Sequence, residues 1–348
     1  HELAATPSVP SASAVSKAAS AVGSACRVLA AVAGIDANSC RKVMEMTVPI
    51  LSDTALSQRF LAGMKPTAAA AAACCSVALP SLKTVCRAAN EYVGYAGVVS
   101  LPEHPLEPFA AELTEAAATF DESQDDAIHV EPCIGIRRLE LLGCLVGWTG
   151  PSPTEPPAPR SLPRLTADQR ARLLDRLLLA VEASGPSPAR ESDGRFSSME
   201  DAPRLACDIL RVSGSALSGC PAHDDALPRL LGAVSRALDA AGEGKWTGSW
   251  PLAALMALSE GDTSFGPRAI SGLGELTASK LPAAMAAGGR HNGLEACMDA
   301  LVRQYERGTG GDSGGVVAEQ MLRAAEIAPV DGGDAGAAGG GLGGGGAG

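Results

Sequence analysis

The stretch LTADQRARLLDRLLLAVE, residues 165–182, carries the clearest structural signal in this chain. Thr166 and Gln169 have capping-box spacing, so each side chain can accept a hydrogen bond from an unpaired backbone N–H at the start of a helix. Leucines and a valine then recur three or four residues apart and form one apolar stripe. On the opposite face, Asp168 and Arg172 are four residues apart and are placed to form an ion pair. The stretch therefore predicts an amphipathic α-helix that buries one face.

The composition extends this prediction to the whole chain. Of 348 residues, 46% are hydrophobic but only 3% are aromatic, so a core must be built from Ala, Leu and Val. Ala and Leu are strong helix formers, whereas sheets favour aromatic and β-branched residues. We therefore expect an all-α protein, organised as an irregular α-solenoid of antiparallel helix hairpins with extended or disordered termini.

Turn residues divide the chain into segments. Prolines are expected to mark helix boundaries, with Pro49 and Pro80 ending helices and Pro203, Pro228 and Pro267 opening them. The predicted segments are an extended N-terminus (1–12), an N-terminal helical array (13–148), a Pro-rich linker (149–164), a C-terminal helical-repeat array (165–327) and a Gly/Ala-rich tail (328–348). Further helices are expected around residues 56–64 and 317–325.

The series of amphipathic helices, without a strict sequence repeat, resembles that of degenerate α-solenoid proteins. HEAT-like arrays and the helical-repeat proteins of organelle complexes are the nearest types. The resemblance implies a stacking scaffold with a concave binding surface. It carries over no site residues, because no motif matches residue by residue.

Charge limits the classes of partner. The net charge is −11, which argues against a general nucleic-acid binder. However, residues 1–100 carry eight Lys or Arg against five Asp or Glu, so a local basic surface near the N-terminus is expected. The longest apolar run, residues 68–79, is shorter than the roughly 18 residues of a membrane span, so no span is predicted.

Cysteine usage indicates a compartment. The ten cysteines form no CxxC pair and lie mostly within apolar helical patterns, which is typical of reduced, buried thiols. We therefore expect an intracellular, reducing compartment. Residues 3–35 contain no acidic residue, as at the end of a mitochondrial transit region or in an ordinary Ala-rich first helix.

No complete catalytic, cofactor or metal site is predicted. Residues 311–315, GDSGG, match the nucleophile loop of chymotrypsin-like serine proteases, with Ser313 as the serine, but the all-β context of that family is absent. Residues 242–247, GEGKWT, lack the spacing of a phosphate loop. His223 lies near Cys220, Asp224 and Asp225, where an aspartate is expected to cap the next helix rather than to join a metal site.

Two groups of residues are candidates for partner binding. Trp246 and Trp250 lie close together in an aromatic-poor chain, either as core anchors, as a protein-contact hot spot or as a base-stacking platform. Arginines gather around the helix 165–182, either as a solvated face or as contacts to an acidic partner or RNA phosphate. The arginine candidates are Arg164, Arg170, Arg172 and Arg176.

These observations support two functional expectations of different classes. The first is a non-enzymatic scaffold or interaction subunit of a large multiprotein assembly, in an organelle. The alternative is an RNA-associated helical-repeat protein of a mitochondrial ribosome. A hydrolase that uses the GDSGG loop is a third alternative, which requires a His and an Asp to gather beside Ser313.

Overall fold

The computed structural model describes residues 12–56, 68–95, 104–119, 133–148, 162–182, 197–240, 249–287 and 292–306, and all regular elements in these ranges are helical. The first half contains α1 (Ala12–Ala33), α2 (Ala37–Ala55), α3 (Ala68–Tyr95), the 3₁₀ turn η1 (Glu107–Phe109), α4 (Ala110–Ala118) and α5 (Cys133–Leu145). The second half contains α6 (Ala167–Glu182), α7 (Ser197–Leu217), α8 (Pro221–Ala240), α9 (Ser249–Gly261), α10 (Phe265–Ala287) and α11 (Asn292–Glu306). The all-α prediction is confirmed.

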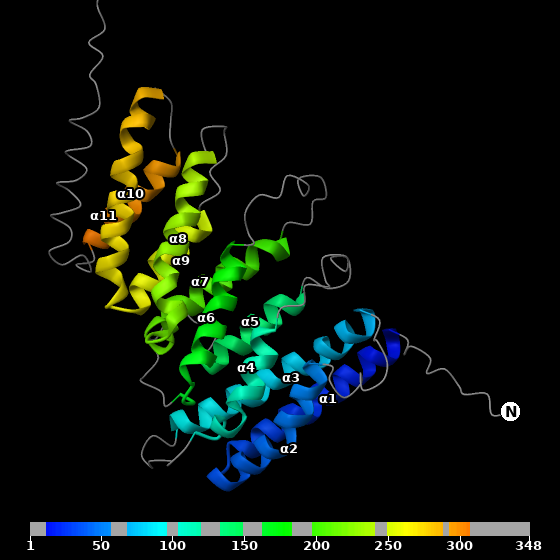
Figure 1. Ribbon diagram of the computed structural model, residues 1–348. Helices are drawn as coiled ribbons and strands as arrows, with labels where there is room; N and C mark the ends of the chain where they lie inside the picture. Colours follow the sequence, from blue (N-terminus) through cyan, green and yellow to red (C-terminus); the bar gives the residue numbers. More distant parts are fainter. Residues whose placement is uncertain are drawn as a thin grey trace, which may run out of the picture.

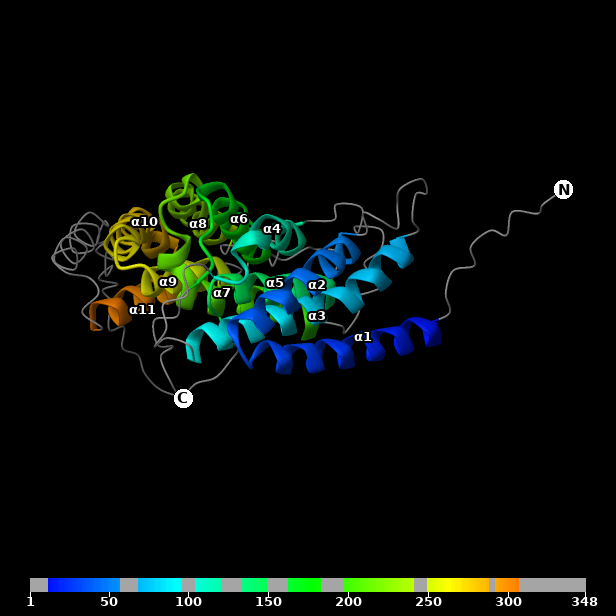
Figure 2. The ribbon, with the colours of Figure 1, turned by 90° about the horizontal axis from the view of Figure 1, so that it is seen from below.

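The helices follow one another along a single stack, from α1–α3 at one end to α10 and α11 at the other (Figure 1). Seen from below, α4, α6, α8 and α10 lie in one row and α5, α7, α9 and α11 in a second (Figure 2). Each helix contacts its neighbours within its own row, such as α4 with α6 and α7 with α9. Contacts such as α6 with α7 and α8 with α9 join the rows. The stack therefore consists of two layers.

One hydrophobic cluster occupies the space between the layers. It extends from Cys26 in α1 to Leu301 in α11 and consists mainly of Ala, Leu, Val and Cys. The α4–α6 and α5–α7 contacts carry this packing from the first half of the chain to the second. Among the described helices, none is both long and apolar enough to cross a membrane.

Local capping signals are realised as the spacing predicts. The backbone N–H of Gln169 donates to Thr166 Oγ1 at 3.2 Å, and that of Thr166 donates to Gln169 Oε1 at 2.8 Å. Asp36 caps α2, because its Oδ1 accepts from the backbone N–H of Ser39 at 2.9 Å. The hydrogen bonds that Asp36 accepts from the backbone N–H and the hydroxyl of Ser39 hold the pKa of its carboxyl below the usual value. Both helix starts are therefore fixed by short-range sequence.

Of the five prolines predicted to mark helix boundaries, Pro267 does so, in the first turn of α10, and the other four do not. Pro49, Pro80, Pro203 and Pro228 all lie inside helices, and Pro80 joins two predicted helices into the single α3. A proline inside a helix costs about 3 kcal/mol, whereas burying one Leu or Val side chain contributes about 1.5–3 kcal/mol. Around Pro80, the fully buried Leu79, Leu82 and Val85 outweigh that cost. Tertiary burial thus overrides the local break.

Several predictions concern residues outside the described ranges. They are the helix predicted over residues 56–64, of which only Leu56 is described, most of the linker, the helix at 317–325 and the terminal segments 1–11 and 328–348.

Two helix backbones approach each other closely where α7 crosses α9. A Cβ added at Gly261 would lie 2.8 Å from the carbonyl oxygen of Arg211 and 3.0 Å from the backbone nitrogen of Gly214. A Cβ added at Gly214 would lie 2.8 Å from the carbonyl carbon of Gly261. Because these neighbours are backbone atoms, they cannot move aside as a flexible side chain can. Glycine at both positions therefore permits the α7–α9 contact.

We predict that Gly261→Ala destabilises the fold by about 2 kcal/mol or more, because its methyl group would overlap the α7 backbone. The measurement is the free energy of unfolding from denaturant titration. Gly23→Ala in α1 is the matched control, since a Cβ there meets nothing within 4 Å. The control should stabilise the helix by about 0.5–1 kcal/mol. Equal effects at the two sites would contradict the crossing.

Candidate functional site

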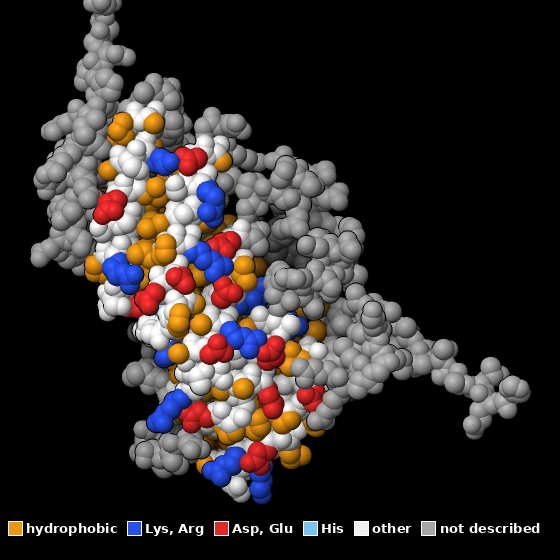
Figure 3. All heavy atoms as spheres, in the orientation of Figure 1, with side chains coloured by type: hydrophobic (Ala, Val, Ile, Leu, Met, Phe, Trp, Pro, Cys, Tyr) orange, Lys and Arg blue, Asp and Glu red, His pale blue; other side chains and the backbone are white. Residues whose placement is uncertain are grey.

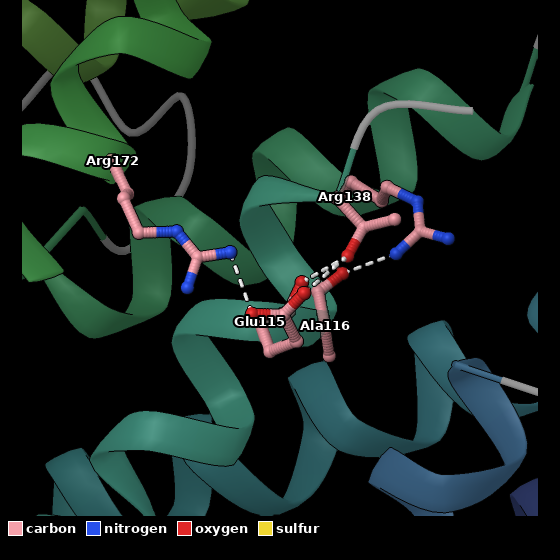
Figure 4. Close-up of polar contacts among 5 residues, drawn as sticks. Glu115, Ala116, Arg138 and Arg172 are labelled. Atoms are coloured by element: carbon pink, nitrogen blue, oxygen red, sulfur yellow. Dashed lines mark hydrogen bonds and ion pairs between the residues drawn. The ribbon is translucent and has the colours of Figure 1, made fainter. Parts of the chain in front are cut away.

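Polar side chains at the centre of the stack join α4 to two neighbouring helices (Figure 4). Arg172 of α6 reaches Glu115 of α4, with Nη2 2.6 Å from Oε2. Arg138 of α5, only 3% exposed, donates to the backbone carbonyl of Ala116 in α4 and lies 3.6 Å from the thiol of Cys75 in α3. The buried Arg138 was not identified as a site residue from the sequence, although a cation within an apolar helix was the available signal. The described partners of Arg138 give it a structural role.

Ion pairs recur between helices that are neighbours in one row. In one row, Arg229 of α8 pairs with Asp175 and Glu182 of α6, and Lys280 of α10 pairs with Asp239 of α8. In the other row, Arg211 of α7 pairs with Glu260 of α9 at 2.9 Å, and Lys83 of α3 pairs with Glu140 of α5, the first helix of that row, at 2.8 Å. Blue and red side chains accordingly lie interspersed on the face shown in Figure 3. Much of the charge on the described helices therefore connects helix to helix.

The predicted arginine patch is largely engaged within the protein. Arg164 lies 3.7 Å from Glu107, and Arg170 donates to the carbonyl of Gly219 at 3.3 Å. Arg172 pairs with Glu115 rather than with the predicted partner Asp168, because α4 packs beside α6. Burial first, and the nearby charge of Arg138 second, lower the pKa of Arg176. These contacts reduce the cationic charge that the patch offers to a phosphate backbone.

Of the two tryptophans predicted as partner-binding residues, Trp250 lies within the described residues and Trp246 does not. Trp250 lies in the first turn of α9 and is half-buried against the hydrophobic core, which fits its interpretation as a core anchor. Trp246 lies outside the described residues, as do GEGKWT at 242–247 and the GDSGG loop with Ser313. The structure therefore describes only one member of the pair.

His223 lies within α8, where it is 5% exposed and meets Asp262 of the α9–α10 turn. The distance from His223 Nε2 to Asp262 Oδ2 is 3.0 Å, and the ring of Phe265 packs edge-on against the imidazole at 5.5 Å. Asp224 and Asp225 do not cap α8 as predicted, because the helix begins earlier, at Pro221. Since 39 residues separate His223 from Asp262, no local pattern in the sequence reveals their contact.

Asp262 is also held by the start of α10. Its Oδ1 accepts from the backbone N–H of Ser264 at 2.8 Å and from the Ser264 hydroxyl at 2.7 Å. Burial opposes ionisation of this carboxyl, but the Ser264 hydrogen bonds and the neighbouring His223 outweigh it and lower the pKa of Asp262. The ionised carboxylate therefore accepts hydrogen bonds at the start of α10 and lies against His223 of α8.

Eight cysteines have described side chains, and all of these are free and buried, which confirms for them the interpretation of the thiols as small core residues. Burial raises the pKa of Cys207 to about 12 and the pKa values of Cys144 and Cys297 to about 11. Because the thiolate is the reactive form, these residues are core packing groups. Among the described residues, no group of three or more His, Cys, Asp or Glu side chains is placed to hold a metal ion.

An open groove lies between α7, α9 and α11, with a volume of about 330 Å³. Its apolar surface comes from Leu252, Met256 and Ala300, among others. Two guanidinium groups also line it. Arg211 is neutralised by Asp208 and Glu260, whereas Arg303 donates to the backbone carbonyl of Asp299 at 3.2 Å and forms no ion pair with a described carboxylate. The groove therefore combines an apolar floor with one cation that an acidic group can neutralise.

We predict that Arg229→Ala costs about 1–2 kcal/mol, since its Nε and Nη2 hold both Glu182 oxygens at 2.6 and 2.8 Å. Hydrogen bonds to Glu182, opposed by burial and aided by Asp175, raise the pKa of Arg229, as expected for a cation stabilised in the fold. Denaturant titration measures the loss. Arg268→Ala on α10, an exposed position with no ion pair to a described residue, is the control and should change stability by less than about 0.5 kcal/mol. Equal losses would contradict the joining role of Arg229.

We predict that Asp262→Asn lowers stability by about 1–2 kcal/mol near neutral pH. Because the folded-state pKa of Asp262 is lowered, its contribution is present above the ordinary carboxyl value of 3.8 and is lost as the pH falls through the folded-state pKa. The difference between wild type and variant should therefore be constant above about pH 5 and shrink as the pH falls below 3.8, measured by urea titration across both ranges. Asp225→Asn, at an exposed position of α8, is the control. A constant difference across both ranges would show that the charge of Asp262 is not responsible.

Comparison with known proteins leaves the site to be interpreted from its own contacts. No protein-family model, no curated protein and no solved structure matches the chain.

Proposed function

We propose that the two rows of helices form an α-solenoid of helix hairpins and that the chain is a non-enzymatic scaffold, which binds other protein subunits in a large assembly. The observation that carries this proposal is the continuous two-layer stack, in which ion pairs link helices of one row. A stack of this kind exposes long surfaces relative to its core, and such surfaces are what scaffolds use. The organellar location belongs to the same proposal.

The groove between α7, α9 and α11 is the proposed binding surface. Its apolar floor supplies the area that drives association, and Met256 supplies an adaptable side chain. Arg303 supplies a cation at the side of the floor. This combination suits a protein segment with an apolar side and an acidic residue.

The alternative of RNA association receives less support. Arg164, Arg170 and Arg172 already contact carboxylates or a backbone carbonyl of their own chain. RNA phosphates would have to compete with those partners, and the net charge of −11 opposes an approach of RNA. Protein is therefore the preferred class of partner.

The test is affinity purification of the tagged full chain from the cells that produce it, with and without nuclease, followed by cross-linking mass spectrometry. We expect protein partners to persist after nuclease and to cross-link to α9 and α11. Met256→Glu should reduce their recovery by about tenfold or more, because it places a carboxylate on the apolar floor.

Val302→Glu is the matched control, because Val302 is exposed on α11 and is not part of the groove lining. Both variants are first checked for unchanged helical content and thermal unfolding. Partners released by nuclease, with RNA recovered from the untreated sample, would replace the proposal with the RNA alternative. Equal recovery by the two variants would remove the groove from it.

A further inference from the structure

The helix α1 has two apolar faces, of which only one is used inside the protein. Its inner face packs Val22, Cys26 and Leu29 against the core. A second set of apolar residues faces solvent and continues into the turn after the helix, with Val28 65% exposed and Ile35 71% exposed. The set consists of Ala21, Ala25, Val28, Val32 and Ile35, here named the α1 seam.

The spacing within the α1 seam is alternately four and three residues. This is the heptad pattern by which one helix packs along another, with side chains of one inserted between those of its partner. Isolated exposed apolar residues need no explanation, but a contiguous apolar strip on a soluble surface marks an interaction site. In Figure 2, α1 lies along the edge of the stack, where a further helix has access to it. The seam therefore fits an added helix.

The charges near the α1 seam indicate which flanking charges a bound partner helix should carry. Arg27, next to Val28, is exposed, and within the described part of the chain its guanidinium donates to the Ser24 hydroxyl at 3.1 Å. On α2, which contacts α1, Arg41 and Lys42 are exposed and form no ion pair with any described carboxylate. The helix α1 itself contains no acidic residue. The helix that carries the seam and its neighbour α2 thus present exposed cations that form no ion pair with a described carboxylate.

A second copy of the chain fits this surface less well than a foreign helix does. Pairing two α1 helices would add the cations of one copy to those of the other, and α1 offers no carboxylate to neutralise them. The nearby Asp36 is already engaged in capping α2. Like charges across an interface oppose association, whereas opposite charges favour it.

We propose that the α1 seam docks an amphipathic helix of a partner protein, whose apolar stripe is flanked by Asp and Glu. The partner's stripe packs on Val28, Val32 and Ile35, and its carboxylates neutralise Arg27 and the α2 cations. Exposed Met46 and Ile50 of α2, 64% and 60% exposed, provide further apolar surface on the same pair of helices. This surface lies on α1 and α2, whereas the groove proposed above lies between α7, α9 and α11, so either site can exist without the other.

The test uses two fluorescent synthetic helical peptides with the same leucine heptad seam, one flanked by glutamates and the other by lysines. Binding to the full chain is measured by fluorescence anisotropy at low salt. We expect the glutamate peptide to bind and the lysine peptide to bind about tenfold more weakly or less. Val28→Asp should reduce binding of the glutamate peptide by about tenfold, and about 0.5 M salt should weaken it. Arg27→Glu should reduce the preference for glutamate over lysine.

Val302→Asp and Arg268→Glu are the controls, since both residues are exposed and lie on α11 and α10. They should leave peptide binding unchanged. All four substitutions are at exposed positions, and thermal unfolding verifies that each variant is folded. Absence of glutamate-peptide binding, or equal binding by Val28→Asp and wild type, would overturn the proposal. So would sedimentation showing that the chain alone self-associates and that Val28→Asp abolishes this, because a second copy would then occupy the seam.

Discussion

The close crossing of α7 and α9 is the constraint on which the stack depends. With aromatic residues at 3%, the core is built mainly from Ala, Leu, Val and Cys, and many of its positions carry only small side chains. Small side chains leave no voids only if the helices approach closely. At Gly214 and Gly261 the two backbones meet without any side chain between them. The helices on either side, α5 and α11, contact α7 and α9 in turn, so the spacing set at this crossing governs the row.

Polar groups complement this apolar packing. Ion pairs such as Arg229 with Glu182 lie between helices of one row, and the His223–Asp262 contact lies between α8 and the turn before α10. Individually, partly exposed ion pairs contribute little to stability, apart from the bidentate pair of Arg229 with Glu182. Their geometry nevertheless fixes which side of one helix faces the next, because a shift of one residue would separate each cation from its carboxylate. The charged side chains thus serve register more than strength.

The packing of the described helices leaves two apolar surfaces exposed. Between α7, α9 and α11 the packing leaves an apolar groove beside Arg303, and at the other end of the stack α1 exposes a second heptad stripe beside Arg27. In both places an apolar strip adjoins a cation without a described carboxylate partner. Contiguous apolar strips on a protein surface mark interaction sites.

Short-range patterns in the sequence determined the helical class, the capping box at Thr166 and Gln169, and the burial of the cysteines, because each depends on residues only a few positions apart. The same patterns located the arginine patch and Trp250, but they did not reveal which residues these side chains contact. Only the tertiary structure decided that α3 continues through Pro80, that Arg172 turns to Glu115 rather than Asp168, and that His223 meets Asp262. These outcomes depend on contacts between segments far apart in the chain. The energies of those contacts outweigh the local preferences. Local propensity therefore determines where helices form, and burial between the helices determines which residues contact one another.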